Sequence, residues 1–351
     1  MKRIITLISL SAFLFAVLVG CGRSGAKPPA NAGVVNVYNW GEYIDTDLLT
    51  QFKAETGITV NYRTFESNEQ LYSVLKQGGV SYDVIIPSDY MISRLISEDM
   101  LEKINFDNIP NLSLIDEDLR FIDYDPTGEY SVPYTWGTVG IIWNESMIAD
   151  EITSWSALFD ERYSGMILMI DNSRDAFGIA LKYLGHSQNT TNEAELYEAF
   201  DLLAAQKPLL QQYVMDAVYD KLESAEASVG VYYAGDYLTM LESNPDLRFV
   251  IPKEGSNKFI DCMCILKGAE NRENAEAFIN FMCSTDASLA NAEYIGYTSP
   301  NTEVRDIIEL DDLSREIMYP SREITDRCEF FINLPPETLS LLDELWTRLK
   351  A

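Results

Sequence analysis

The sequence predicts an α/β protein of two lobes, each a mainly parallel sheet flanked by helices. Segments that alternate like strands are interleaved with segments of helical periodicity. The 351-residue chain is 47% hydrophobic, so it can bury cores rather than remain disordered. Its length from Val34 onward suits two lobes, each with a core of its own.

The segment 34–90 shows the order strand, helix, strand, helix, strand. The strand patterns are VVNVYN, ITVNYRTF and YDVIIPSDY, and the helical patterns between them are TDLLTQFKAETG and NEQLYSVLKQGG. Gly57 ends the first helix, and Ser67 or Asn68 begins the second. This order predicts neighbouring parallel strands joined by right-handed crossovers.

The same alternation returns further along the chain. GMILMID, ASVGVYYAGD, LRFVIP and FIDCMCILKG are strand patterns, and NSRDAFGIALKYLG, DYLTMLES and ENRENAEAFINFMC are helical patterns. A last helix is expected from Pro336 to Leu349, because its leucines recur at helical spacing. No internal repeat of fixed period is present, and two α/β lobes fit the length and the alternation.

The N-terminus has the pattern of an export signal. Lys2 and Arg3 precede a short apolar run, and the run ends in LVGC. LVGC resembles a bacterial lipobox, which predicts a signal peptide over 1–20 and a lipid on Cys21. An ordinary signal peptide with an incidental cysteine is the alternative. Residues 21–33 are rich in Gly, Ala and Pro and are predicted to form a flexible tether.

The chain is strongly acidic, with 26 basic and 55 acidic residues and a net charge of −29. Nucleic acid is therefore a poor partner, because its phosphates are repelled. Cations are attracted at long range. For most of these carboxylates, solubility alone is an equally good explanation.

Four cysteines remain after Cys21, namely Cys262, Cys264, Cys283 and Cys328. An exported protein could pair them as two disulfides. Cys262 and Cys264 lie two apart on a predicted strand and face opposite sides, so they are poor partners for each other. The sequence has no C-x-x-C motif and no histidine near these cysteines, so a zinc site is not expected. We expect four buried free thiols.

Aromatic and acidic residues gather where predicted strands end or begin. Ligands of open parallel sheets bind beyond the carboxyl ends of the strands. Lysine and arginine are scarce there, with Arg174 as the exception. The residues are Trp40, Glu42 and Tyr43; Ser88, Asp89 and Tyr90; Asp171, Asn172 and Asp175; Tyr233 and Asp236; and Phe259 and Asp261.

This composition favours a linear polyamine as ligand. Ammonium groups are attracted to aromatic faces and need carboxylate partners when they leave water. Methylene chains pack well between aromatic rings. Single residues have simpler explanations: Trp40 can belong to a core, and Asp175 and Asp236 stand where helix dipoles favour acids. Asp261 is harder to explain in this way, because it interrupts an apolar run and a charge there is costly to bury without a partner.

Eight motifs resemble the substrate-binding component of spermidine/putrescine ABC importers, in family order over the chain after the signal. They are YNWGEY (38–43), ETGITVNYRTFESNE (55–69), YDVIIPSDY (82–90), YSVPYTWG (130–137), SWSALF (154–159), NSRDAF (172–177), YYAGD (232–236) and IGYTSPN (295–301). The resemblance implies a periplasmic-binding-protein-like fold whose two lobes close about a hinge. It implies an N-terminal lobe of 34–137 plus 253–300 and a C-terminal lobe of 138–252 plus 301–351.

The resemblance also assigns roles within the site. Trp40, Tyr43 and Tyr297 line an aromatic slot, Tyr90 forms its wall, and Glu42, Asp175, Asp236 and Asp261 face amines. Ser88, Asn172, Tyr233 and Phe259 are also expected to bind the ligand. The chain departs from the family pattern at five positions: Gly41, Asn172, Tyr233, Phe259 and Phe331. Putrescine-like and spermidine-like features are therefore mixed, and the resemblance leaves the preference between the two open.

The expected function is that of a monomeric, non-enzymatic binding protein without cofactor or metal. It would bind putrescine or spermidine outside the cell membrane, stay anchored through the lipid on Cys21, and deliver its ligand to a permease. One alternative is the same fold with a sugar or another organic cation. A secreted hydrolase using two carboxylates is another. The only histidine, His186, lies in a loop expected to be exposed, and G-x-S-x-G, P-loop and H-E-x-x-H motifs are absent.

Overall fold

The computed structural model describes residues 33–79 and 81–351. The predicted signal peptide, Cys21 and nearly all of the predicted tether lie outside the described residues. Within the described part of the chain, no helix is long and apolar enough to cross a bilayer.

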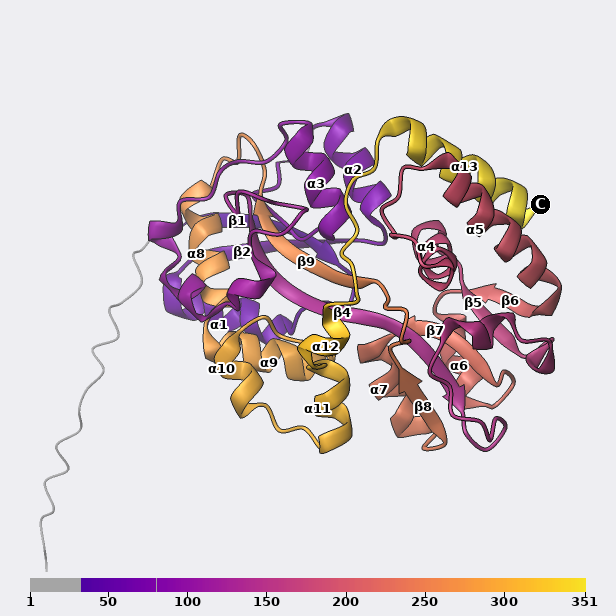
Figure 1. Ribbon diagram of the computed structural model, residues 1–351. Helices are drawn as coiled ribbons and strands as arrows, with labels where there is room; N and C mark the ends of the chain where they lie inside the picture. Colours follow the sequence, from indigo (N-terminus) through magenta and orange to yellow (C-terminus); the bar gives the residue numbers. More distant parts are fainter. Residues whose placement is uncertain (1–32, 80) are drawn as a thin grey trace, which may run out of the picture.

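The strands form one sheet in the order β2-β1-β3-β9-β4-β7-β5-β6, with β8 also paired to β4. Their bounds are β1 (Val34–Trp40), β2 (Thr59–Phe65), β3 (Val84–Ile85), β4 (Ser131–Asn144), β5 (Ile167–Ile170), β6 (Leu210–Val214), β7 (Val229–Tyr233), β8 (Leu247–Val250) and β9 (Lys258–Ile265). Figure 1 shows β1, β2 and β9 on one side of the molecule and β5 to β8 on the other.

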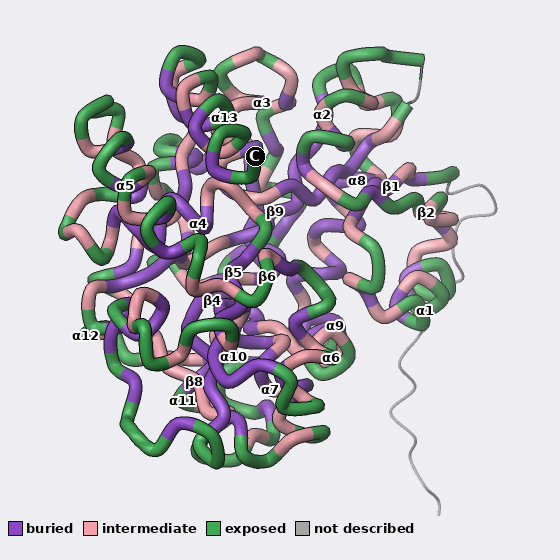
Figure 2. The backbone as a smooth tube through the Cα atoms, turned by 90° about the vertical axis from the view of Figure 1, so that its right-hand side faces the viewer, coloured by how far each residue is buried: buried purple, intermediate pink, exposed green. Residues whose placement is uncertain are grey.

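The α-helices cover both faces of the sheet. They are α1 (Thr46–Thr56), α2 (Asn68–Gln77), α3 (Asp89–Ser97), α4 (Ser173–Leu184), α5 (Glu193–Gln206), α6 (Ala217–Glu223), α7 (Ala234–Ser243), α8 (Arg272–Met282), α9 (Thr285–Ile295), α10 (Thr302–Ile307), α11 (Asp312–Met318), α12 (Arg322–Thr325) and α13 (Pro336–Lys350). Figure 2 shows buried backbone along the strands and exposed backbone on the outer helices.

The predicted two-lobed α/β class is confirmed, and each half of the sheet is mixed rather than purely parallel. β1 pairs in parallel with β2 and β3, as the alternation of 34–90 predicts. β5 likewise pairs in parallel with β6 and β7. The antiparallel members are the strands around β4, where the chain crosses between the halves.

β4 holds the two halves together. Its first part pairs with β9 up to Thr138, and its second part pairs with β7 from Val139 onward. This strand was not predicted from the sequence, because Pro133 and two glycines interrupt its apolar pattern. The ladder shifts register between Pro133 and Thr135, which is how the sheet tolerates the proline.

The predicted helix boundaries agree with the structure at most positions. Ser67 caps α2 with its side chain, and Gly57 ends α1 in the left-handed conformation that glycine allows. The last helix begins at Pro336 as predicted. All four described cysteines are buried and free, as expected.

The lobes have separate cores. One core fills the half around β5 and β7, with Trp155 and Phe177 among its buried residues. Two further clusters lie around β1 and β3, one including Phe52 and Phe278 and the other including Leu71 and Leu95. Separate cores joined by a few crossing segments are the usual architecture of proteins that open and close.

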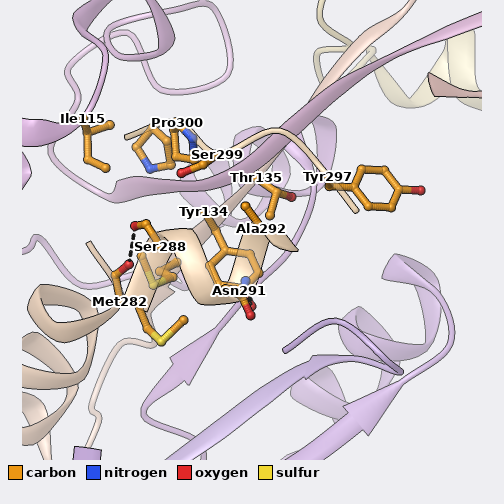
Figure 3. Close-up of a pocket in the computed structure, with 12 residues that line it drawn as sticks. Ile115, Tyr134, Thr135, Met282, Ser288, Asn291, Ala292, Tyr297, Ser299 and Pro300 are labelled. Carbon is orange, nitrogen blue, oxygen red and sulfur yellow. Dashed lines mark hydrogen bonds between the residues drawn. The ribbon is translucent and has the colours of Figure 1, made fainter. Parts of the chain in front are cut away.

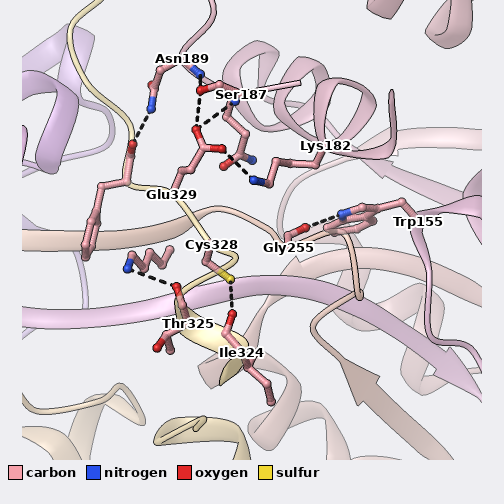
Figure 4. Close-up of polar contacts among 12 residues, drawn as sticks. Trp155, Lys182, Ser187, Asn189, Gly255, Ile324, Thr325, Cys328 and Glu329 are labelled. Carbon is pink, nitrogen blue, oxygen red and sulfur yellow. Dashed lines mark hydrogen bonds and ion pairs between the residues drawn. The ribbon is translucent and has the colours of Figure 1, made fainter. Parts of the chain in front are cut away.

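The segment 326–335, here called the C-terminal strap, joins α12 to α13. Glu329 accepts hydrogen bonds from the Lys182 ammonium at 2.7 Å and the Ser187 hydroxyl at 2.6 Å (Figure 4). The backbone N–H of Glu329 donates to the Ser256 carbonyl at 3.0 Å, and the Lys258 N–H donates back to Glu329 at 3.0 Å. The strap is thus tied both to α4 and to the chain entering β9.

Gly255 lies where the strap and the chain before β9 pack most tightly. Its φ is +86°, and an added Cβ would lie 1.9 Å from the Arg327 carbonyl oxygen. Gly165 has a similar φ of +77°, but its Cβ would meet nothing within 4 Å. We expect Gly165→Ala to cost about 1 kcal/mol, from left-handed backbone strain alone. Gly255→Ala should cost at least twice that, measured by urea unfolding, and equal costs would contradict this account of the strap.

Candidate functional site

The site is built around Asp261 on β9, whose side chain is only 4% exposed. The Tyr43 hydroxyl donates to Asp261 Oδ2 at 2.6 Å and lies 2.6 Å from the Thr135 hydroxyl on β4. Burial raises the pKa of Asp261 to about 6, against the opposing effect of hydrogen bonds from Ser88 and Tyr43. Burial, together with the Asp261 charge, holds the pKa of Tyr43 well above its usual range, so Tyr43 remains a donor.

A line of aromatic rings runs from the first half of the molecule to the second. Successive ring centroids are separated by 5.7 Å, 5.8 Å, 5.9 Å and 5.4 Å, all within the range of favourable aromatic contact. The rings, in order, are Tyr134, Tyr43, Tyr297, Phe259 and Tyr233. Four of these five were predicted to belong to the site, and Tyr134 was not.

Asp236 meets this line from α7. Its Oδ2 accepts from the Tyr297 hydroxyl at 2.5 Å, and its Oδ1 accepts from the Tyr219 hydroxyl. Burial raises the pKa of Asp236, and the two tyrosine donors oppose the rise. Gly235 allows this approach, because an added Cβ would lie 2.8 Å from the Gly296 carbonyl oxygen. Asp236 was predicted from the sequence to belong to the site, whereas Tyr219 was not.

Asp175 lies in the first turn of α4 and is 4% exposed. Its Oδ1 accepts from the Asn257 side-chain amide at 3.0 Å. Burial raises the pKa of Asp175 to about 6, against hydrogen bonding from Asn257 and the positive charge of Arg174. Asn172, predicted as a ligand residue, caps α4 with its side-chain oxygen, which accepts from the N–H groups of residues 174 and 175.

Ser88 immediately precedes α3, and Tyr90 is the second residue of that helix. The Asn68 amide donates to both hydroxyls at 3.1 Å, and the Tyr90 hydroxyl donates to Glu69 at 3.0 Å. Between them lies Asp89, which is 1% exposed and was not among the predicted ligand residues. Its position directly after an apolar strand could have identified Asp89 as a site residue. A serine followed by an aspartate at that place is equally typical of the start of a helix.

Trp40 and Glu42 lie at the end of β1 and in the turn that follows. The Trp40 ring packs on Phe65 at 4.6 Å, as expected for a residue on the edge of a core. Glu42 is exposed and has a φ of +51°, a left-handed conformation that few residues other than glycine adopt. The structure therefore brings Tyr43 into the aromatic line and leaves Glu42 at the surface of the site.

Several buried polar atoms at this interface have no hydrogen-bond partner in the described part of the chain. They are Trp40 Nε1, Asp89 Oδ2, Thr138 Oγ1, Asn257 Oδ1 and Asp261 Oδ1. Such atoms are rare in folded proteins, because an unpaired buried polar group is costly. Four other such atoms, in Gln206, Tyr213, Ser228 and Tyr319, lie outside the site. The five atoms named above can accept hydrogen bonds from a ligand or donate them to it.

A small cavity of about 10 Å³ adjoins the site and is drawn in Figure 3. Its lining includes Tyr134, Thr135 and Tyr297, and in Figure 3 the Tyr297 ring points away from the other lining residues. The volume is about that of one water molecule, so the cavity is too small for an organic ligand. Among the described residues, no group of three or more His, Cys, Asp or Glu side chains could hold a metal.

The arrangement can bind a cation with an apolar chain. Buried carboxylates supply charge, and aromatic rings supply flat apolar surface. His186, the only histidine of the sequence, contacts Glu198 and Glu195 on α5, at 3.0 Å and 3.9 Å, and no hydrogen bond or ion pair among the described residues joins it to Asp175, Asp236 or Asp261. Phe331 of the strap is buried, with the Arg174 guanidinium 4.4 Å from its ring.

The class defined by this fold and site is that of two-lobed solute-binding proteins. Residues 47–316 match the family model described as bacterial extracellular solute-binding protein. The chain belongs to this family.

Particular relatives share nearly the whole chain. The "Spermidine/putrescine-binding periplasmic protein" of Escherichia coli (strain K12) is 33% identical over 341 residues, covering 96% of this chain and 97% of that protein. The crystal structure of the spermidine/putrescine ABC transporter substrate-binding protein PotD from Streptococcus pneumoniae is 36% identical, with a TM-score of 0.84, covering 91% of this chain and 98% of that one. The Tp0655 (TpPotD) lipoprotein of Treponema pallidum is 28% identical, with a TM-score of 0.81, covering 90% and 99%.

The raised pKa values of Asp175 and Asp261 predict an unusual pH dependence of stability. Unfolded aspartates titrate near 4, so the folded protein binds more protons than the unfolded chain between about pH 4 and 6. The stability that these two groups contribute is fully present below pH 4 and is lost as the pH rises through 6. We expect the free energy of unfolding without ligand to fall by up to about 1.4 kcal/mol per pH unit and per acid across this window.

The measurement is urea unfolding between pH 4 and 7, for the wild type and for Asp175→Asn/Asp261→Asn. The neutral variant removes these two titrations and should flatten the profile, while surface carboxylates contribute equally to both proteins. Parallel profiles for the two proteins would contradict the assignment.

Proposed function

We propose that this protein is the extracytoplasmic polyamine-binding component of an ABC importer. It captures putrescine or spermidine between its two lobes and delivers the ligand unchanged to a permease. The observation that carries the proposal is the aromatic line from Tyr43 to Tyr233, with buried carboxylates bonded to its tyrosines. Relatives whose names state spermidine and putrescine binding support the same ligand class.

The chemistry of the site suits an ammonium group at each end of a methylene chain. Tyrosine and phenylalanine rings offer apolar walls, and Asp261, Asp236 and Asp175 offer negative charge. An uncharged sugar would stack on the same rings but would leave several carboxylates buried without a cation. A carboxylate or phosphate ligand would face repulsion from the same acids.

In this proposal the N-terminal lobe comprises residues 34–137 and 253–300, and the C-terminal lobe comprises residues 138–252 and 301–351. The change of β4 partners between Thr138 and Val139 supports the first boundary. The Tyr297–Asp236 hydrogen bond then joins one lobe to the other. Closure about the crossing segments would exclude water and strengthen each pairing of ammonium with carboxylate.

Calorimetric titration with putrescine and spermidine tests the proposal. We expect at least one of them to bind, and Asp261→Ala to weaken its binding by about 2 kcal/mol or more, because a buried charge partner is lost. Asp306→Ala, which removes an exposed acid of α10, is the control and should leave affinity unchanged. A folded wild type that binds neither polyamine would refute the function, and an unaffected Asp261→Ala variant would remove Asp261 from the site.

The proposal includes a membrane anchor on Cys21 and a monomeric protein in contact with its permease. The LVGC sequence supports lipidation, and a relative in Treponema pallidum is named a lipoprotein. We expect the full-length protein to incorporate radioactive palmitate in bacterial cells and to sediment with membranes. Cys21→Ser should abolish both, whereas Cys328→Ser should abolish neither. Label retained in Cys21→Ser would contradict the anchor.

A further inference from the structure

Asp89, the first residue of α3, carries a carboxylate that the roles described so far leave unused. It is 1% exposed, and its Oδ1 accepts from the adjacent N–H of Tyr90 at 2.7 Å. Its Oδ2 is buried and makes no hydrogen bond of regular geometry with the described residues, although the Phe331 backbone N–H is near enough to lower the pKa of Asp89. A helix N-terminus favours an acid, but it does not account for full burial of an oxygen without a regular hydrogen bond.

Asp89 lies beside Asp261. Ser88 forms an isolated β-bridge with Asp261, and the Cys262 N–H donates to the Pro87 carbonyl at 3.1 Å. The start of α3 and this part of β9 are therefore in direct contact. Asp261 Oδ1 likewise makes no hydrogen bond of regular geometry, although the nearby Ser88 hydroxyl lowers the pKa of this acid. Two carboxylate oxygens that could accept from a ligand therefore come from two adjoining elements.

The charges around Asp89 are unbalanced without a cation. Burial holds the pKa of Asp89 well above its usual range, the Asp261 charge adds to the rise, and Arg174 on α4 opposes it. The Arg174 guanidinium is held in place by the Ile332 carbonyl at 3.2 Å and Asn189 Oδ1 at 3.1 Å. Arg174 also faces Asp175, so its single positive charge is shared between Asp89 and Asp175. An ammonium group would supply the positive charge that Asp89 and Asp261 lack when both are ionised.

We propose that Asp89 is a further ligand carboxylate, which together with Asp261 receives a single ammonium group of the polyamine. The two oxygens, Asp89 Oδ2 and Asp261 Oδ1, accept two N–H groups of that ammonium. Arg174 supplies the remaining positive charge from the other lobe. This inference rests on the proposed polyamine function and adds a residue and a charge arrangement to it.

The variant Asp89→Asn tests the proposal, because asparagine keeps the shape and the Oδ1 acceptor for Tyr90. Calorimetry with putrescine and spermidine should show affinity at least tenfold weaker for the ligand that the wild type prefers. Thermal unfolding without ligand should be unchanged or shifted upward, because an unpaired buried acid has been neutralised. The matched control is Asp125→Asn. Asp125 is also 1% exposed, but its oxygens accept from the Gly128, Tyr130 and Ser131 groups at 2.8–3.0 Å, so its loss should lower stability.

A second readout separates ligand contact from a structural role. An ammonium placed between Asp89 and Asp261 stabilises their ionised forms, so binding releases protons. The titratable groups facing Asp89 are Asp261, Tyr90, Arg174, Tyr124 and Cys262, and the Phe331 backbone N–H also lies beside it. Calorimetry at pH 6 in buffers of different ionisation enthalpy counts these protons, and Asp89→Asn should release fewer than the wild type.

The outcomes distinguish this inference from the function on which it rests. A wild type that binds no polyamine refutes both. A wild type that binds, with an Asp89→Asn variant of equal affinity and equal proton release, refutes the role of Asp89 alone. Weakened binding accompanied by the same loss of stability as in Asp125→Asn would also overturn it, since the effect would then be structural.

Discussion

The structure depends on carboxylates that are kept out of water at the interface between two lobes. Asp261, Asp236 and Asp175 are each held by one or two neutral donors, and none is paired with a lysine or arginine at ion-pair distance among the described residues. Neutral donors offset only part of the cost of burying charge. The remaining cost appears as raised pKa values, and a cationic ligand is the partner that would remove it.

The sheet explains how such a costly interface is maintained. The carboxylates lie on elements from both halves, and β4 joins the halves as one continuous strand whose residues are almost all buried. The cores of the two halves stabilise each lobe separately, so the interface does not have to be stable by itself. Stability is thus concentrated in the lobes, and the surface between them is free to favour a ligand.

The sequence predicted the parts of the fold that follow from local pattern. The order of apolar runs and glycine stops gave the three parallel strands of the first lobe and the ends of its helices. β4 escaped prediction because Pro133 and the glycines at 137 and 140 conceal a strand whose partners are distant in sequence. In the site, Asp261 was predicted because an acid within an apolar run needs an explanation. Asp89 was not, since its burial and the contacts of its Oδ2 depend on how α3 packs against β9.

The C-terminal strap links the crossing region to the charge of the site. It fixes Arg174 through the Ile332 carbonyl and the Phe331 ring, while Glu329 ties the same segment to Lys182 and Ser187. Arg174 in turn faces Asp89 from the other lobe, so its influence on that carboxylate depends on the distance between lobes. Opening would weaken this attraction and expose the acids to water, which favours their ionised forms. Closure on an ammonium group would restore both the attraction and the exclusion of water, and the strap would then couple the position of the lobes to the charge that the ligand meets.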